Sequence, residues 1–132
     1  MQCFNLEVTA PLSPAEADTV AWLLRETYDP ARSTPASSLD ASSGTIVEVG
    51  PRLTFSTAWS ANAVSVCAAC GIGQVSRIER SRRFAVQSAT ALTAEEQHAF
   101  AALVHDRMTE QVYSAPLATF TVRRRRFAVL CV

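Results

Sequence analysis

The chain has 132 residues, which is enough for one domain with a hydrophobic core and too few for two substrate-binding lobes. Hydrophobic residues make up 48% of the sequence, and this share argues against disorder. The formal net charge is zero, which argues against a general binder of polyanions, and all 12 basic residues are arginine. The sequence has neither an apolar run long enough to cross a bilayer nor a signal peptide, so we expect a cytoplasmic protein without membrane association.

The first third of the chain predicts a strand, a helix and a loop. Residues 4–8 alternate apolar and polar side chains, which is the pattern of a half-buried strand. Ser13 followed by Pro14 and Glu16 is a capping box with proline at the first helical position, so a helix is predicted from Pro14 to about residue 27. The polar stretch 29–43 is predicted to be a loop.

The middle of the chain predicts two strands and a second helix. Residues 45–49 and 52–57 are predicted strands on either side of a Gly-Pro turn. Ser60 is the predicted N-cap of a helix that runs to Cys70, where the following glycine can end it.

The last part of the chain predicts a strand, a helix and a short final strand. Residues 74–88 are predicted to be extended, with a bulge or bend at 80–83 where the alternation slips. A capping box at Thr93 starts a helix that is predicted to continue to about Tyr113. Its apolar side chains follow helical spacing and are expected to be buried: Phe100, Leu103, Val104, Met108 and Val112. Residues 118–122 are predicted to form a strand.

These elements predict an α+β fold, in which helices cover one face of a mainly antiparallel sheet. Their order, β-α-β-β-α-β-α-β, divides into two α/β halves. We expect one domain over residues 1–122 and an arginine-rich tail over 123–132.

The two cysteines of the C-A-A-C motif are not expected to carry chemistry. A redox pair of this kind opens a helix, whereas Cys67 and Cys70 fall near the end of one. A zinc site needs about four ligands, and the sequence contains no second pair. No nucleophile elbow and no phosphate-binding glycine loop is present, so the sequence predicts neither a catalytic residue nor a metal site.

Several charged groups leave alternatives open. The arginines of residues 77–83 could bind a phosphate or a carboxylate-lined partner, or they could be solvated or make an intrachain or interdomain contact. The segment 105–110 carries Asp106, Arg107 and Glu110, and it is interpreted as a charged or interface face of a helix rather than a catalytic cluster. The run Arg123–Arg126 could attract nucleic acid, which the zero net charge makes less expected than a solvated tail.

Three motifs in a family-like order carry a resemblance that covers about residues 14–120. The segment VEVGPRLTFSTAWSANAVSVCAACGIGQVSRIERSRRF (47–84) resembles the N-terminal region of large, single-chain phosphoribosylformylglycinamidine synthases. The segments LVHDRMTEQVY (103–113) and AWLLRETYDP (21–30) are similar to two further helices of that region. The chain departs from the family pattern at Thr54, where asparagine is common, and after Phe120.

The resemblance implies a noncatalytic domain of a glutamine- and ATP-dependent ligase of purine biosynthesis. In that family the N-terminal domain is similar to a dimer of PurS, the small accessory subunit of split bacterial versions, and it packs between the synthetase and glutaminase portions. The resemblance implies no cofactor in this chain and Mg-ATP in the complete enzyme, and a homodimer of the isolated domain is a further possibility. The residues that it suggests as interdomain contacts are Arg52, Ser60, Asn62, Arg77, Glu79, Arg83, Asp106, Arg107 and Glu110.

Two other functions remain as alternatives. A freestanding ferredoxin-like module could bind a nucleotide or nucleic acid through the arginine-rich strand and the tail, and its affinity would depend strongly on salt. A redox or zinc function of the C-A-A-C motif would require a low-pKa thiol or a bound metal.

Overall fold

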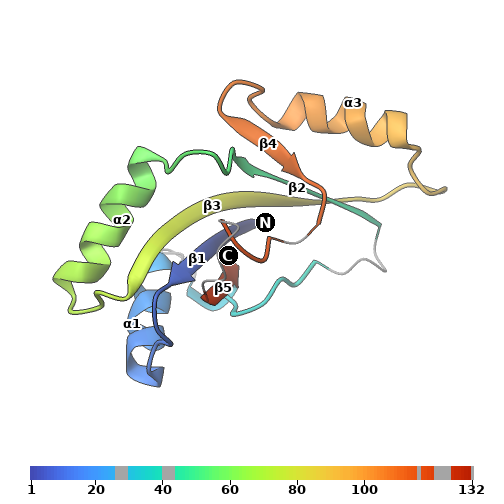
Figure 1. Cartoon of the computed structure of the whole chain (residues 1–132). Coiled ribbons are helices and arrows are strands. Elements are labelled where there is room, and N and C mark those ends of the chain that lie inside the picture. The colour runs from blue at the N-terminus through green and yellow to red at the C-terminus, as the bar shows by residue number, and fades with distance from the viewer. Residues whose placement is uncertain (26–29, 40–43, 116, 121–125, 132) are drawn as a thin grey trace.

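One antiparallel sheet and three α-helices make up the fold (Figure 1). The structure is a computed structural model that describes residues 1–25, 30–39, 44–115 and 117–120, and the backbone of 126–131. The strand order in the sheet is β4-β2-β3-β1-β5. The elements are β1 (Gln2–Val8), α1 (Pro14–Leu24), the 3-10 helix η1 (Pro30–Arg32), β2 (Thr45–Pro51), α2 (Ala58–Ala69), β3 (Val75–Val86), α3 (Ala94–Val104), β4 (Glu110–Tyr113) and β5 (Arg126–Cys131).

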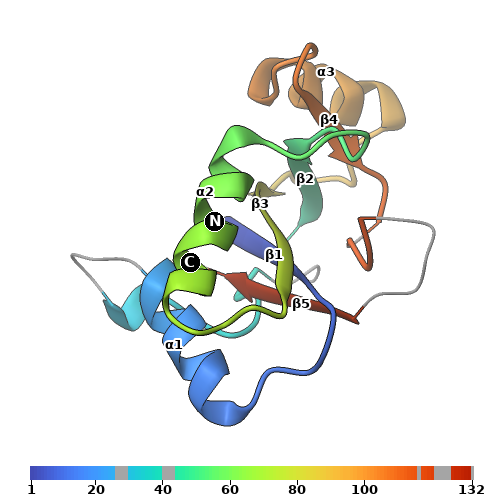
Figure 2. The same ribbon diagram turned by 60° about the vertical axis from the view of Figure 1, so that its left-hand side comes forward.

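The long strand β3 joins two parts of the sheet. It pairs with β1 up to Arg82, which lies opposite Gln2, and it pairs with β2 from Arg82 to Val86. The two pairings overlap only at Arg82. Figures 1 and 2 show α1 and α2 beside the part that contains β1, whereas α3 lies beside the part that contains β2.

The hydrophobic core lies between the helices and one face of the sheet, in two clusters. The first cluster packs α1 and α2 against residues of β1 and β3, and Ile78 at its centre is completely buried. The second cluster packs α3 against Val47 and Val49 of β2 and Phe84 of β3. Ile78 and Phe84 are six residues apart on one strand, so both clusters lie on the same sheet face. The predicted α+β fold, with helices on one face of an antiparallel sheet, is therefore confirmed.

Helix α2 has well-defined caps at both ends. Thr57 is the N-cap, because its side chain accepts a hydrogen bond from the Ser60 N–H. At the C-terminal end, Gly71 has a φ of 82° and its N–H donates to the Ala68 carbonyl, while the Ile72 N–H donates to the Cys67 carbonyl. These two bonds form a Schellman motif. The prediction of Ser60 as N-cap is wrong, because Ser60 lies inside the helix and its hydroxyl accepts the Ile78 N–H at 3.1 Å.

The predicted strand at 52–57 is wrong. Residues after Pro51 leave the sheet and lead into α2. The carbonyls of Leu53 and Phe55 accept from the Arg77 guanidinium of β3 instead of from a neighbouring strand, whereas the Arg52 N–H donates to the Thr109 carbonyl. An alternation of apolar and polar residues cannot distinguish a ladder of strand bonds from such side-chain bonds.

The predicted helix that reached Tyr113 ends at Val104, and His105 is its C-cap. Residues 110–113 pair with β2 as β4, with Glu48 opposite Tyr113. The apolar spacing suggested a continuous buried stripe, yet Leu103 is 85% exposed and Met108 is 82% exposed. Residues 110–113 form their backbone hydrogen bonds with the edge of β2. The apolar residues that matched a helical pattern therefore do not lie on one buried helix face.

The end of the chain also differs from the prediction. Residues 118–120 form no strand, and 121–122 lie outside the described residues, as do Arg123–Arg125. Arg126–Cys131, expected to be part of a tail, forms β5 and pairs with β1. Of the bulge or bend expected at 80–83, the bulge is absent, because pairing is continuous there and the register shifts between Glu7 and Val8 instead.

The close approach of β4 to β2 at Gly50 gives a test of the sheet. An added Cβ at Gly50 would lie 2.6 Å from the Tyr113 Oη and 3.0 Å from the Ser81 Cβ. We expect Gly50→Ala to lower the free energy of unfolding by about 1–3 kcal/mol, measured by urea denaturation. Gly73→Ala is the matched control, since its Cβ would meet no atom within 4 Å. Equal stability of the two variants would contradict the close approach.

Candidate interdomain interface

The arginine-rich strand β3 presents its charges on two different faces. Side chains alternate along a strand, so Arg80 and Arg82 share the helix-covered face with Ile78. Arg77 and Arg83 lie on the opposite face. The expected cluster of four arginines is therefore divided by the pleat of the strand.

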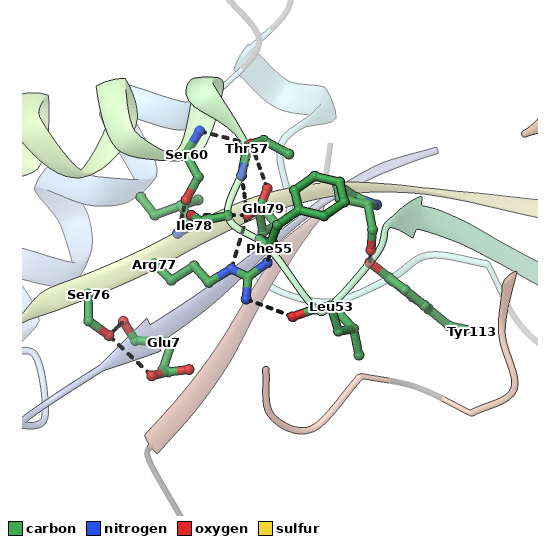
Figure 3. Close-up of polar contacts among 12 residues, drawn as sticks. Glu7, Leu53, Phe55, Thr57, Ser60, Ser76, Arg77, Ile78, Glu79 and Tyr113 are labelled. Carbon is green, nitrogen blue, oxygen red and sulfur yellow. Dashed lines mark hydrogen bonds and ion pairs between the residues drawn. The ribbon is translucent and has the colours of Figure 1, made fainter. Parts of the chain in front are cut away.

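On the face away from the helices, Arg77 and Glu79 form a buried ion pair (Figure 3). The Arg77 Nε lies 3.0 Å from the Glu79 Oε1, and the two side chains are 12% and 1% exposed. The same guanidinium donates to the carbonyls of Leu53 and Phe55, and its Cζ lies 4.4 Å from the centre of the Phe120 ring. Glu79 accepts from the N–H of Thr57 at 3.0 Å and from its hydroxyl at 2.7 Å. The pair therefore fastens the segment before α2 to β3.

A second buried group on that face surrounds Glu48. Its carboxylate accepts from the Arg83 Nε at 2.7 Å and from the Ser81 hydroxyl at 2.5 Å. The Ser81 hydroxyl in turn accepts from the Asn5 amide at 2.9 Å. Tyr113 donates its hydroxyl to the Pro51 carbonyl at 2.9 Å, and burial, followed by the charge of Glu48, raises the pKa of its phenol well above the ordinary value. These bonds connect β1, β2, β3 and β4 on the face of the sheet away from the helices.

A cleft of about 320 Å³ lies beside the start of α2. Arg80 stacks over the Trp59 ring, with 4.5 Å between its Cζ and the ring centre. Arg82 donates to both carboxylate oxygens of Glu110, at 2.9 and 2.7 Å. The cleft is lined by Gln2, Pro51, Thr57, Trp59, Glu79, Arg80, Arg82 and Glu110.

Hydrogen bonds hold the turn between α3 and β4. The Asp106 carboxylate accepts from the Met108 N–H at 2.8 Å and from the Thr109 hydroxyl at 2.9 Å. These bonds, of which the Met108 N–H is the larger cause, lower the pKa of the Asp106 carboxyl below its usual value. The side chain of Arg52, the residue after β2, donates to the Arg107 carbonyl at 2.6 Å. The turn is therefore defined by its own bonds, although the side chain of Met108 is exposed.

We call the exposed apolar side chains of this region the α3–β4 corner, which consists of Leu103, Met108 and Val112. Their side chains are 85%, 82% and 40% exposed. Leu103 lies near the end of α3, Met108 in the turn and Val112 on the edge strand β4. The sequence suggested all three as core residues because they fit a helical stripe. The signal for the turn was Asp106 three residues before Thr109, a pair that forms a local cap here.

The structure brings the candidate contact residues into separate groups. Ser60, Arg77 and Glu79 lie together at the start of α2, and both Ser60 and Glu79 are 1% exposed. Arg83 belongs to the group around Glu48, and Asn62 lies on α2 at a pocket between α1 and α2. The remaining four, Arg52, Asp106, Arg107 and Glu110, lie around the α3–β4 turn.

The C-A-A-C cysteines occupy different environments. Cys67 is buried in the first core cluster, whereas Cys70 is the exposed C-cap of α2. Burial, with a smaller effect of Cys70, raises the pKa of the Cys67 thiol. Among the described residues, no group of three metal-binding side chains comes together. No helix in the described ranges has the length and apolar character needed to span a membrane.

Comparison with known proteins shows the family. Residues 1–119 match the family described as formylglycinamide ribonucleotide amidotransferase N-terminal. The chain belongs to this family. Its relatives include the "Probable phosphoribosylformylglycinamidine synthase, chloroplastic/mitochondrial" of Arabidopsis thaliana, which is 45% identical over 90% of this chain. The phosphoribosylformylglycinamidine synthases of Dictyostelium discoideum and Homo sapiens are each 40% identical, over 89% and 90% of it. This chain spans 9% of the length of each of the three relatives.

The buried ion pair predicts a large difference between two glutamine variants. Glu79→Gln leaves the Arg77 guanidinium buried without its counter-charge, so we expect the free energy of unfolding to fall by about 2–4 kcal/mol. Arg82→Gln is the control, because Arg82 in its pair with Glu110 is 46% exposed, and we expect a loss below about 1 kcal/mol. Urea denaturation of both variants measures the difference, and equal losses would show that Glu79 does not hold the α2 start.

The two environments predict unequal reactivity of Cys67 and Cys70. A raised pKa leaves the Cys67 thiol protonated at neutral pH, and burial blocks access to it. We expect iodoacetamide to alkylate Cys70 at least about tenfold faster than Cys67, as followed by mass spectrometry of peptides. Rapid and equal alkylation of both would contradict the structure and reopen the redox interpretation.

Proposed function

We propose that this chain is a noncatalytic assembly domain of a phosphoribosylformylglycinamidine synthase. The support is the family match over residues 1–119, together with the 9% of each relative that the chain spans. The complete enzyme uses glutamine and ATP to make formylglycinamidine ribonucleotide in purine biosynthesis, with Mg-ATP bound outside this chain. The partners of the domain are the synthetase and glutaminase portions of that enzyme.

The observation that carries the proposed contact is the α3–β4 corner. Exposed apolar side chains that are held rigidly can act as anchors of a binding surface. Leu103 and Met108 are more than four-fifths exposed, beside a turn that Asp106 fixes. Arg107 is exposed in the same turn. We assign this corner to the contact with the remainder of the enzyme.

The interior charges contribute indirectly. Glu79 and Ser60 are buried, and their bonds hold the start of α2. Substituting either residue therefore affects the stability of the domain itself rather than a direct contact with the remainder of the enzyme. Arg52, Asn62, Asp106 and Arg107 are exposed and remain the direct contact candidates of the original set.

A polyanion-binding module receives less support. Arg77 pairs with Glu79 and Arg83 pairs with Glu48 inside the domain. These two arginines are therefore not available to neutralise the phosphates of a nucleic acid. The homodimer and the cytoplasmic location stay predictions. The name of the Arabidopsis relative places that protein in the chloroplast or mitochondrion.

Complementation tests the assembly role. The Dictyostelium relative is expressed without the region that aligns with this chain, and glutamine- and ATP-dependent formation of the amidine product is followed after the chain is added. We expect activity to return with this chain. Leu103→Ser combined with Met108→Ser should weaken binding by tenfold or more, about 1.4 kcal/mol, because two apolar anchors are lost.

Val66→Ser on α2 is the matched control, since Val66 is also exposed, at 49%, but lies away from the corner. Its affinity should stay within about twofold of the unsubstituted chain. Binding measured by calorimetry that is unchanged by the double substitution would assign the contact to another surface. Absence of both binding and activity would contradict the assembly role in trans.

A further inference from the structure

Two cysteines lie directly opposite each other in neighbouring strands. In the antiparallel pair of β1 and β5, the register places Cys3 across from Cys131, and the register continues without a shift to Val8 and Arg126. The family match ends at residue 119, so Cys131 lies outside the shared region. The C-A-A-C motif drew attention in the sequence, whereas this second pair is 128 positions apart and meets only in the fold.

The hydrogen bonds at the start of β1 determine the kind of pair that the two cysteines form. The Met1 amino group donates to the Arg83 carbonyl at 3.0 Å, and the Arg83 N–H donates to the Met1 carbonyl at 2.8 Å. Hydrogen-bonded and non-hydrogen-bonded pairs alternate along an antiparallel ladder, so Cys3 is again bonded to β3, opposite Ser81. Its backbone polar groups therefore point toward β3.

Toward β5, Cys3 and Cys131 consequently form a non-hydrogen-bonded pair. The Cα atoms of such a pair are about 4.5 Å apart. Disulfides join residues whose Cα atoms are about 4.4–6.8 Å apart. The backbone placement is therefore within reach of a cross-strand disulfide.

We propose that Cys3 and Cys131 are a redox modification site, at which a low-molecular-weight disulfide oxidises the two thiols to an intrachain disulfide. One cysteine thiolate attacks a sulfur of the reagent, forms a mixed disulfide and displaces one reagent thiol. The second cysteine thiolate attacks the protein sulfur of that mixed disulfide and displaces the other reagent thiol. The two cysteines lose two electrons and two protons, and the reagent is reduced to two thiols.

Burial limits access to this site. Cys3 is 0% exposed, and β5 is an edge strand that pairs only with β1 in the described sheet. A reagent therefore reaches Cys3 through a local opening of the structure, which costs less than global unfolding. After oxidation, the crosslink holds β5 on β1 and closes a loop of almost the whole chain, which restricts the unfolded state.

The experiment uses the full chain and a variant with Cys67→Ser and Cys70→Ser, treated with oxidised glutathione. Trypsin cleaves after arginine, so Cys3, the C-A-A-C pair and Cys131 fall in three different peptides, 1–25, 53–77 and 127–132. We expect a linked peptide of 1–25 with 127–132 in both proteins. The oxidised chain should also unfold at a higher temperature, an increase that dithiothreitol reverses and that Cys131→Ser abolishes.

Three outcomes would overturn the proposal. A disulfide found only between Cys67 and Cys70, a stable glutathione adduct on either strand cysteine without the linked peptide, or a link formed only between two chains would each exclude the site. If the double serine variant does not fold, the peptide map of the unsubstituted chain still decides. The readout contains no synthase activity, so its failure leaves the assembly role untouched.

Discussion

The ion pair between Arg77 and Glu79 determines how the chain passes from β2 to α2. Without a neighbouring strand, the carbonyls of Leu53 and Phe55 depend on the Arg77 guanidinium, and the N-cap Thr57 depends on Glu79. The passage from β2 to α2 places the Trp59 ring against the Phe4 ring. Trp59 also lines the cleft, where Arg80 stacks over its ring. One buried pair on β3 therefore positions α2 relative to both faces of the sheet.

The two faces of the sheet have different physical roles. The helix-covered face provides apolar burial in two clusters, whereas the opposite face carries Asn5, Glu48, Glu79 and Ser81, all buried. Buried charges of this kind contribute little net stability but strongly disfavour arrangements that separate them. Their bonds connect β1, β3 and β2 on the face opposite the hydrophobic clusters. Arg77 and Arg83 are thus structural, and the exposed α3–β4 corner is the surface that we propose for contact with the remainder of the enzyme.

The sequence identified the family and part of the site. The motifs of residues 47–84 led to the family that the comparison shows, and the caps at Ser13 and Thr93 were confirmed. Sequence reasoning also grouped Asp106 with Glu110, which do meet, although through a turn rather than along a helix. It missed Glu48 and Tyr113, because their partners lie on other strands and no local pattern shows which strand will be the neighbour.

By itself, the sequence determined the α+β class, the starts of α1 and α3 and the end of α2, since capping boxes and a glycine C-cap act within a few residues. Only the tertiary structure decided that residues 52–57 leave the sheet and that Cys3 lies opposite Cys131. It also decided that the helix ends at Val104, that residues 110–113 form β4, and that Leu103 and Met108 are exposed. Apolar spacing records how a segment could bury a face, but strand pairing and buried charge pairs join residues far apart in the sequence. Those long-range contacts choose which of the possible faces is used.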